Sequence, residues 1–153
     1  MPKAKLKKGL RRLEPLLGQW VHMGDSGLGK LTCNRHFSSL LDGHRVRLDA
    51  IWSYDDPKRS DYVELCIFGL NKDGVLGFHS FVNDGTSSNG LLADADELVE
   101  TTICFEAQMP HGLARQTYWP DEVGGWNWKV ERKLKSGWSP IIEQAYRPDG
   151  NGL

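Results

Sequence analysis

The stretch HRVRLDAIWSY, residues 44–54, decides the fold class of this chain. Every second position in it is apolar, and the positions between are mostly arginine, aspartate and serine. The apolar positions are Val46, Leu48, Ala50, Trp52 and Tyr54. Because successive side chains of a β-strand point to opposite faces, this alternation is typical of a strand with one buried face. Residues 126–132 repeat the pattern around two tryptophans.

Further strand-like segments follow along the chain, each bounded by turn signals. They are residues 62–70, 75–82, 98–109, 113–119 and 138–147. Asp-Gly and Asn-Gly pairs, such as Asp42-Gly43 and Asn89-Gly90, supply the positive φ angles that tight hairpins need. Nine or ten strands at this spacing predict an antiparallel sandwich or barrel.

The composition agrees with a single all-β domain. The chain has 153 residues, of which 17 are Gly and 6 are Trp, and its net charge is −1. A near-neutral chain is not a nucleic-acid binder driven by bulk charge, so we expect no nucleic acid as a partner. We expect a basic, partly disordered tail over residues 1–9, a barrel domain over 10–148 and a short tail over 149–153. We also expect a monomer or a homodimer.

The N-terminus is the helical candidate. Leu6, Leu10, Leu13 and Leu17 recur at helical spacing, although Pro15 interrupts the pattern. Six basic residues and no acid lie within residues 1–12. The segment is open to three interpretations: a solvated start, a helix that caps one barrel end, or a weak contact with an anionic membrane.

The expected compartment is the cytoplasm. No apolar stretch of signal-peptide length follows the basic tail. The three cysteines are widely spaced and form no CxxC pair, so we interpret them as reduced, mostly buried residues.

The expected helix leads directly into Gly18-Gln19-Trp20. Gly-x-Trp after a short helix, followed by a meander of strands that ends in Tyr146-Arg147, resembles the bacterial lipocalin-like proteins of the calycin superfamily. The likeness to fatty-acid-binding and nitrobindin-type barrels is more distant. The resemblance covers about residues 10–147 and implies an all-β, antiparallel up-and-down barrel of about eight to ten strands with an interior cavity. It also implies that Trp20 closes one barrel end, with Arg147 against its ring.

A barrel of this kind holds one small ligand in a cavity lined by aromatic side chains and a few polar groups. The leading hypothesis is therefore non-catalytic binding of a small hydrophobic or amphipathic molecule, as a carrier or a sensor. We expect Trp52, His79 and Phe81 to point inside, and Arg115 or His79 to fix one polar or anionic group. The full set of expected ligand-binding residues is Trp52, Phe68, His79, Phe81, Arg115, Trp126 and Trp128.

Three alternatives share this fold. A single histidine binds haem in some similar barrels, the same cavity suits an enzyme acting on an apolar substrate, and a solid barrel suits a protein-interaction module. The five histidines show no HxH or HExxH spacing, so no metal ligands, catalytic residues or resident cofactor are predicted. Glu64 lies in the most apolar run, where a carboxylate must be paired or protonated. We expect an ion pair with Arg115 or Arg47.

The stretch Gly24–Lys30 matches the phosphate-loop pattern GxxxxGK. That motif needs Ser or Thr next and a helix beyond it, whereas Leu31 follows here and the chain beyond has strand character. We interpret the stretch as a glycine-rich hairpin turn.

Overall fold

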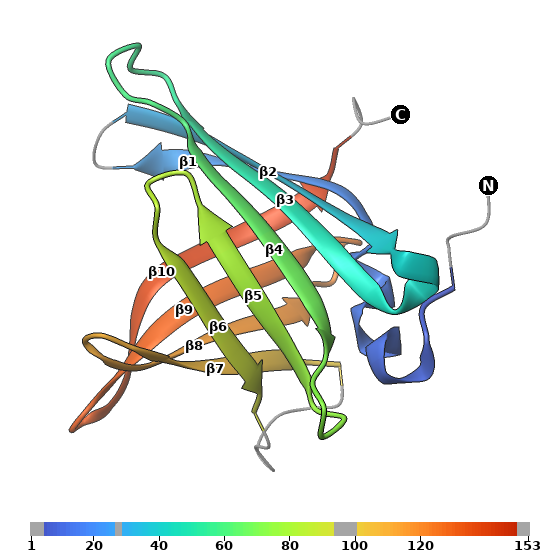
Figure 1. The fold of residues 1–153 in the computed structure, drawn as a ribbon. Coiled ribbons are helices and arrows are strands. Elements are labelled where there is room, and N and C mark those ends of the chain that lie inside the picture. The colour runs from blue at the N-terminus through green and yellow to red at the C-terminus, as the bar shows by residue number, and fades with distance from the viewer. Residues whose placement is uncertain (1–4, 27–28, 94–100, 150–153) are drawn as a thin grey trace.

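The computed structural model describes residues 5–26, 29–93 and 101–149, which form a closed antiparallel barrel of ten strands (Figure 1). Each strand pairs with its neighbours in sequence, and β1 pairs with β10 to close the barrel. Two 3-10 helices accompany the strands, η1 (Lys8–Leu16) and η2 (Leu41–Gly43). The strands are β1 (Gly18–Ser26), β2 (Gly29–Leu40), β3 (Arg45–Tyr54), β4 (Tyr62–Leu70), β5 (Leu76–Val82), β6 (Ser87–Leu92), β7 (Ile103–Met109), β8 (Gly112–Pro120), β9 (Trp126–Leu134) and β10 (Gly137–Pro148). The predicted up-and-down barrel with a short N-terminal helix is confirmed.

The helix η1 closes one end of the barrel. Its buried residues are all leucines, and they pack into the core together with the leucines that flank the helix: Leu6, Leu10, Leu13, Leu16 and Leu17. The backbone N–H of Lys7 donates to the carbonyl of Gly43 at 2.9 Å, and the Arg12 guanidinium donates to the carbonyl of Thr102 at 3.2 Å. Leu6 is thus packed into the core, although it lies within the segment 1–9 that was expected to be a tail. In the part of the chain that the structure describes, no helix has the length and apolar character needed to cross a membrane.

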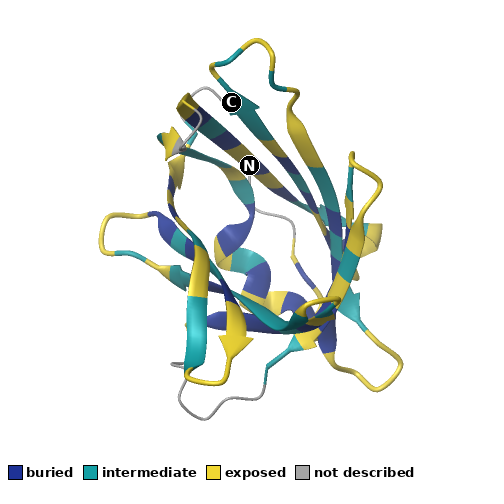
Figure 2. Ribbon diagram, turned by 90° about the vertical axis from the view of Figure 1, so that its left-hand side faces the viewer, coloured by how far each residue is buried: buried dark blue, intermediate teal, exposed yellow. Residues whose placement is uncertain are grey.

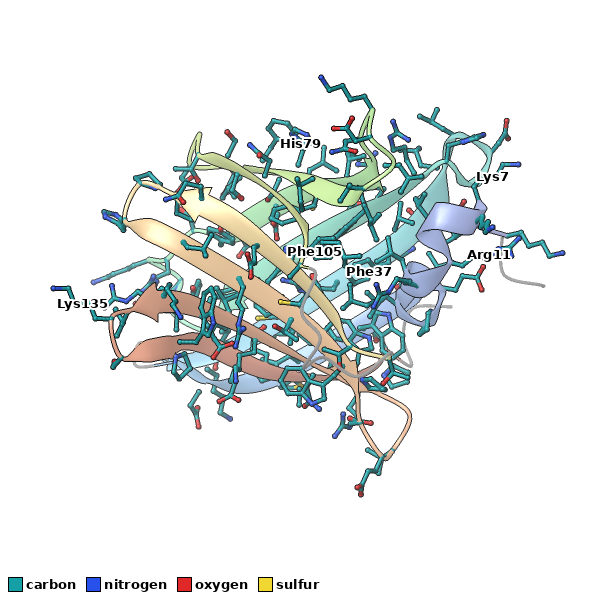
Figure 3. The ribbon with its side chains drawn as sticks, turned by 90° about the horizontal axis from the view of Figure 1, so that it is seen from below. Lys7, Arg11, Phe37, His79, Phe105 and Lys135 are labelled. Atoms are coloured by element: carbon teal, nitrogen blue, oxygen red, sulfur yellow. The ribbon has the colours of Figure 1, made fainter. Side chains whose placement is uncertain are left out.

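Alternate residues of each strand face the barrel interior. In β2 the inward residues are Leu31, Cys33, Arg35 and Phe37, and all four are buried. Figure 2 shows buried and exposed residues alternating along several strands, buried residues on η1, and exposed residues in the hairpin turns. The half of the barrel next to η1 is filled by rings such as Phe37, which Figure 3 shows within the barrel.

The register between β4 and β5 corrects the expectation for residues 75–82. Cys66 pairs with Ser80 and Phe68 pairs with Phe78, so the even-numbered residues of β5 face inward. His79 and Phe81 point outward, and Phe81 is 53% exposed (Figure 3 shows His79 on the outside). The prediction that these two residues lie inside was wrong. Both faces of this strand carry apolar residues, so the pairing with β4 decides which face is buried.

The strand β6 occupies a place where a turn was expected, because Asn89-Gly90 lies within it. A Cβ atom at Gly90 would lie 2.5 Å from the carbonyl oxygen of Glu106 and 2.7 Å from the ring of Phe78. The glycine therefore permits a close approach between neighbouring strands. The stretch Gly24–Lys30 is a hairpin as predicted, since β1 and β2 pair antiparallel up to Ser26 and Gly29.

Candidate functional site

A cavity of about 440 Å³ occupies the half of the barrel away from η1. Its wall reaches Tyr54 at the end of β3, Tyr62 at the start of β4 and Met109 at the end of β7. In Figure 1 these strand ends lie at the end of the barrel opposite η1, where the turns of the β3–β4, β5–β6, β7–β8 and β9–β10 hairpins are. The cavity therefore opens at this end and is closed at the other by the leucines of η1 and the core.

Aromatic rings form much of the cavity wall. Trp52 and Tyr62 are directly opposite each other on β3 and β4, with ring centroids 5.5 Å apart. Trp128 crosses Trp52 at 89°, with centroids 6.4 Å apart. Phe78 and Phe105 separate the cavity from the core beneath it. Trp52 and Trp128, two of the expected ligand-binding residues, therefore line this cavity.

Glu64 is a polar group in the cavity wall. It lies on the inward face of β4, two residues from Tyr62, and its carboxylate accepts a hydrogen bond from the Ser80 hydroxyl. The expected ion pair is not formed. Arg47 instead pairs with Asp49 at 2.8 Å on the outer face, because it alternates with the inward residues of β3.

Gln116 is a second polar group, and its orientation is fixed by its neighbours. Its side-chain oxygen accepts hydrogen bonds from the Trp128 indole N–H at 3.1 Å and from the Tyr118 hydroxyl at 3.3 Å. An indole N–H can only donate, so the amide atom that it contacts must be the oxygen. The Gln116 amide nitrogen is therefore left as a donor at the cavity wall.

Arg35 lies in the barrel interior but does not line the cavity. It is 2% exposed, and its guanidinium carbon lies 4.0 Å from the centre of the Trp128 ring. It donates to the Tyr118 hydroxyl at 2.8 Å, whereas its Nε has no partner among the described residues. Burial raises the pKa of Tyr118, and the positive charge of Arg35 opposes that rise. Among the described residues no carboxylate forms an ion pair with Arg35, so aromatic rings and the hydroxyl groups of Tyr118 and Tyr146 hold it.

Arg115, which was expected to hold a polar group of the ligand, directs its side chain to the outer face of β8. Arg115 is one of the residues that line the cavity, but its Nε lies 2.8 Å from Glu131 and its guanidinium carbon lies 4.2 Å from the centre of the Trp138 ring. The residue alternates with Gln116, which faces inward, so its side chain must point outward. The expectation that Arg115 holds a ligand group inside the barrel is therefore corrected.

Two other expected residues lie away from this cavity. Phe68 is completely buried in the core. Trp126 is stacked on Tyr146 with centroids 4.4 Å apart and lines a second cavity of about 510 Å³, between η1 and the adjacent ends of β7–β9. Because this second cavity lies at the η1 end of the barrel, it is distinct from the site bounded by Trp52 and Trp128.

The contact that the resemblance implied between Trp20 and Arg147 is also corrected. Trp20 donates its indole N–H to the Leu16 carbonyl at 2.7 Å and so ties β1 to η1. Arg147 pairs with Asp121 on the outer face, since it alternates with the inward Tyr146. The arginine that stacks on a tryptophan inside the barrel is Arg35.

Several residues of the cavity wall were not among the expected ligand-binding residues, for example Tyr62 and Gln116, and the buried Arg35 beside the cavity was also missed. Arg35 has the same parity as the apolar residues of β2, and this signal was available. No histidine lies among the described residues that line the cavity. The sequence matches no protein-family model and no curated protein.

Proposed function

We propose that this protein is a lipocalin-like barrel that binds one small hydrophobic or amphipathic molecule, without catalysis, in the cavity opposite η1. The cavity itself carries the proposal. Its volume of about 440 Å³ lies within the range of roughly 300–1,000 Å³ that is typical of small-molecule sites. The alternative of a protein-interaction module assumed a filled barrel interior, and this cavity does not favour it.

The chemistry of the wall supports an amphipathic ligand. The faces of Trp52, Tyr62 and Trp128 provide apolar contact, and burial of apolar area is worth about 25 cal/mol per Å². The Gln116 amide and the Glu64 carboxylate provide a donor and an acceptor at fixed places in the wall. A ligand with an apolar body and one polar end would contact the aromatic rings with its body and hydrogen-bond to Gln116 or Glu64 with its polar end.

A neutral fluorescent dye tests the proposal. We expect N-phenyl-1-naphthylamine to bind at one saturable site, with a blue shift of its emission. Ala114, inward on β8, lines the cavity, so Ala114→Trp should fill it and weaken binding of the dye at least ~10-fold.

Ala145→Trp is the matched control, because Ala145 lies exposed on the outer face of β10. This variant should bind the dye as the parent does. Equal binding by both variants, or the absence of saturable binding in the parent, would overturn the proposal. Circular dichroism of each variant establishes that the barrel is folded.

A further inference from the structure

We infer that the molecule bound in this cavity is an organic cation, an ammonium group on an apolar body, and that Glu64 holds the ammonium beside the rings of Trp52 and Tyr62. This inference rests on the proposed function and goes beyond it by assigning the charge of the ligand and the residues that recognise it.

The first observation is the charge that the cavity wall presents. Among the described residues, the wall contains two charged side chains, Glu64 and Arg115. The Arg115 guanidinium is held on the outer face by Glu131, so Glu64 alone directs its charge inward. A carboxylate has about four acceptor positions, and the Ser80 hydroxyl uses one of them. The remaining positions are available to a ligand that donates hydrogen bonds.

The second observation is the arrangement of rings around this carboxylate. Glu64 and Tyr62 lie on the same face of β4, and Trp52 is directly opposite Tyr62. The faces of tryptophan and tyrosine attract cations, and aromatic sites of this kind recognise ammonium ligands. The negative charges of Glu64 and Asp84 add to burial in raising the pKa of the Tyr62 hydroxyl, and the positive charge of Arg35 opposes that rise. This side of the cavity therefore combines two aromatic rings with the carboxylate of Glu64.

Among the described residues no cation forms an ion pair with Glu64, and the positive charge of Arg35 acts on this carboxylate only at longer range. Arg35 is engaged by the Tyr118 hydroxyl and by the Trp128 ring, and it does not line the cavity. Arg59 stacks on Tyr54 with its guanidinium carbon 4.4 Å from the ring centre. A carboxylate ligand would thus meet Glu64 directly and no unengaged arginine, whereas an ammonium ligand would meet an acceptor and two rings.

Three ligands with one body and different ends test the inference. They are 2-(1-naphthyl)ethylamine, 2-(1-naphthyl)ethanol and 3-(1-naphthyl)propionate, titrated into the full chain at pH 7 by isothermal titration calorimetry. We expect the amine to bind about 10-fold or more tightly than the alcohol, and the carboxylate to bind most weakly.

Glu64→Gln keeps the shape of the side chain and an oxygen for Ser80, and it should reduce the advantage of the amine to within about threefold. Glu143→Gln removes the same charge from the exposed face of β10 and should retain the full advantage. An alcohol or carboxylate that binds as well as the amine overturns the inference, as does an amine advantage that survives Glu64→Gln. If Glu64→Gln does not fold, the ligand series with the parent chain still decides the sign of the charge.

The dye of the preceding section separates the two proposals. Binding of the neutral dye without a preference for the amine refutes the inference and leaves the proposed function supported. Failure of both the dye and the three ligands to bind refutes the proposed function itself.

Discussion

Arg35 is a cation enclosed in the barrel without an ion-pair partner among the described residues. Its charge is stabilised by the Trp128 ring at 4.0 Å, by the Tyr118 hydroxyl at 2.8 Å, and at longer range by Glu64. Burying a charge is costly unless it is paired and hydrogen-bonded. Because the Nε of Arg35 has no partner among the described residues, a neutral side chain of similar volume at this position should stabilise the folded barrel about as well as arginine does.

Arg35→Met should destabilise the protein less than Arg35→Ala. Alanine leaves a void and removes the contacts with the rings, which we expect to lower the free energy of unfolding by about 3–5 kcal/mol. Methionine fills most of the volume and removes the charge, and the Tyr118 hydroxyl keeps Gln116 as an acceptor. Urea unfolding of the two variants measures the difference. An equal loss for both would show that the charge, rather than the volume, holds this part of the barrel together.

The helix η1 closes one end of the barrel with leucines that lie along one of its faces. Leu13 is completely buried, whereas Lys8, Arg11 and Arg12 on the other side of the helix are exposed. In Figure 3, Lys7 and Arg11 point away from the barrel. The helix thus contributes to stability through its leucines and stands at the barrel end opposite the candidate site.

Leu13→Ala should lower stability without changing the affinity for the neutral dye. Replacement of a buried leucine by alanine costs about 2.7–5 kcal/mol, and the void forms at the end of the barrel away from the cavity. Leu41→Ala is the control, because Leu41 is largely exposed. Urea unfolding and dye titration of both variants check this. A parallel loss of dye affinity in Leu13→Ala would contradict the separation of the two barrel ends.

The strands and side-chain orientations could be predicted from the sequence only where the local pattern of apolar and polar residues determines them. The strand around Trp52 was predictable because its two faces differ sharply in polarity. The orientation of His79 was predicted wrongly because both faces of β5 carry a phenylalanine, Phe78 and Phe81, and the pairing with β4 decides which of them is buried. The Asn89-Gly90 pair carries a turn signal, but close packing against Glu106 explains the glycine instead. Glu64 could be singled out, whereas its lack of an arginine partner follows only from the three-dimensional arrangement.

At the scale of the whole molecule, closure removes both sheet edges and shields the interior groups together. Burial raises the pKa of Cys33 from its ordinary value of 9.0 to about 11, and it raises the pKa of Tyr146 from 10.0 to about 12. Both groups are therefore neutral in the folded barrel at pH values where they ionise in the unfolded chain.

The free energy of unfolding should fall in alkali. The folded state holds more protons than the unfolded state above about pH 9, so stability decreases as the pH rises from 9 toward 11 for Cys33 and from 10 toward 12 for Tyr146. At about 1.4 kcal/mol per pKa unit, each group accounts for a loss on the order of 2–3 kcal/mol. Urea unfolding at a series of pH values measures the slope, and Cys33→Ala should make it shallower between pH 9 and 11. An unchanged slope in that variant would exclude the thiol as a source.

The closure of one barrel end by η1 has a kinetic consequence for any bound molecule. A cavity with one opening gives association and dissociation the same route, and both pass through the same transition state. A bulky substitution in the hairpin turns around that opening, away from the bound molecule, should slow both rate constants by the same factor. The dissociation constant would then stay fixed while the residence time lengthens, so the turns set how long a ligand stays and the cavity wall sets which ligand it is.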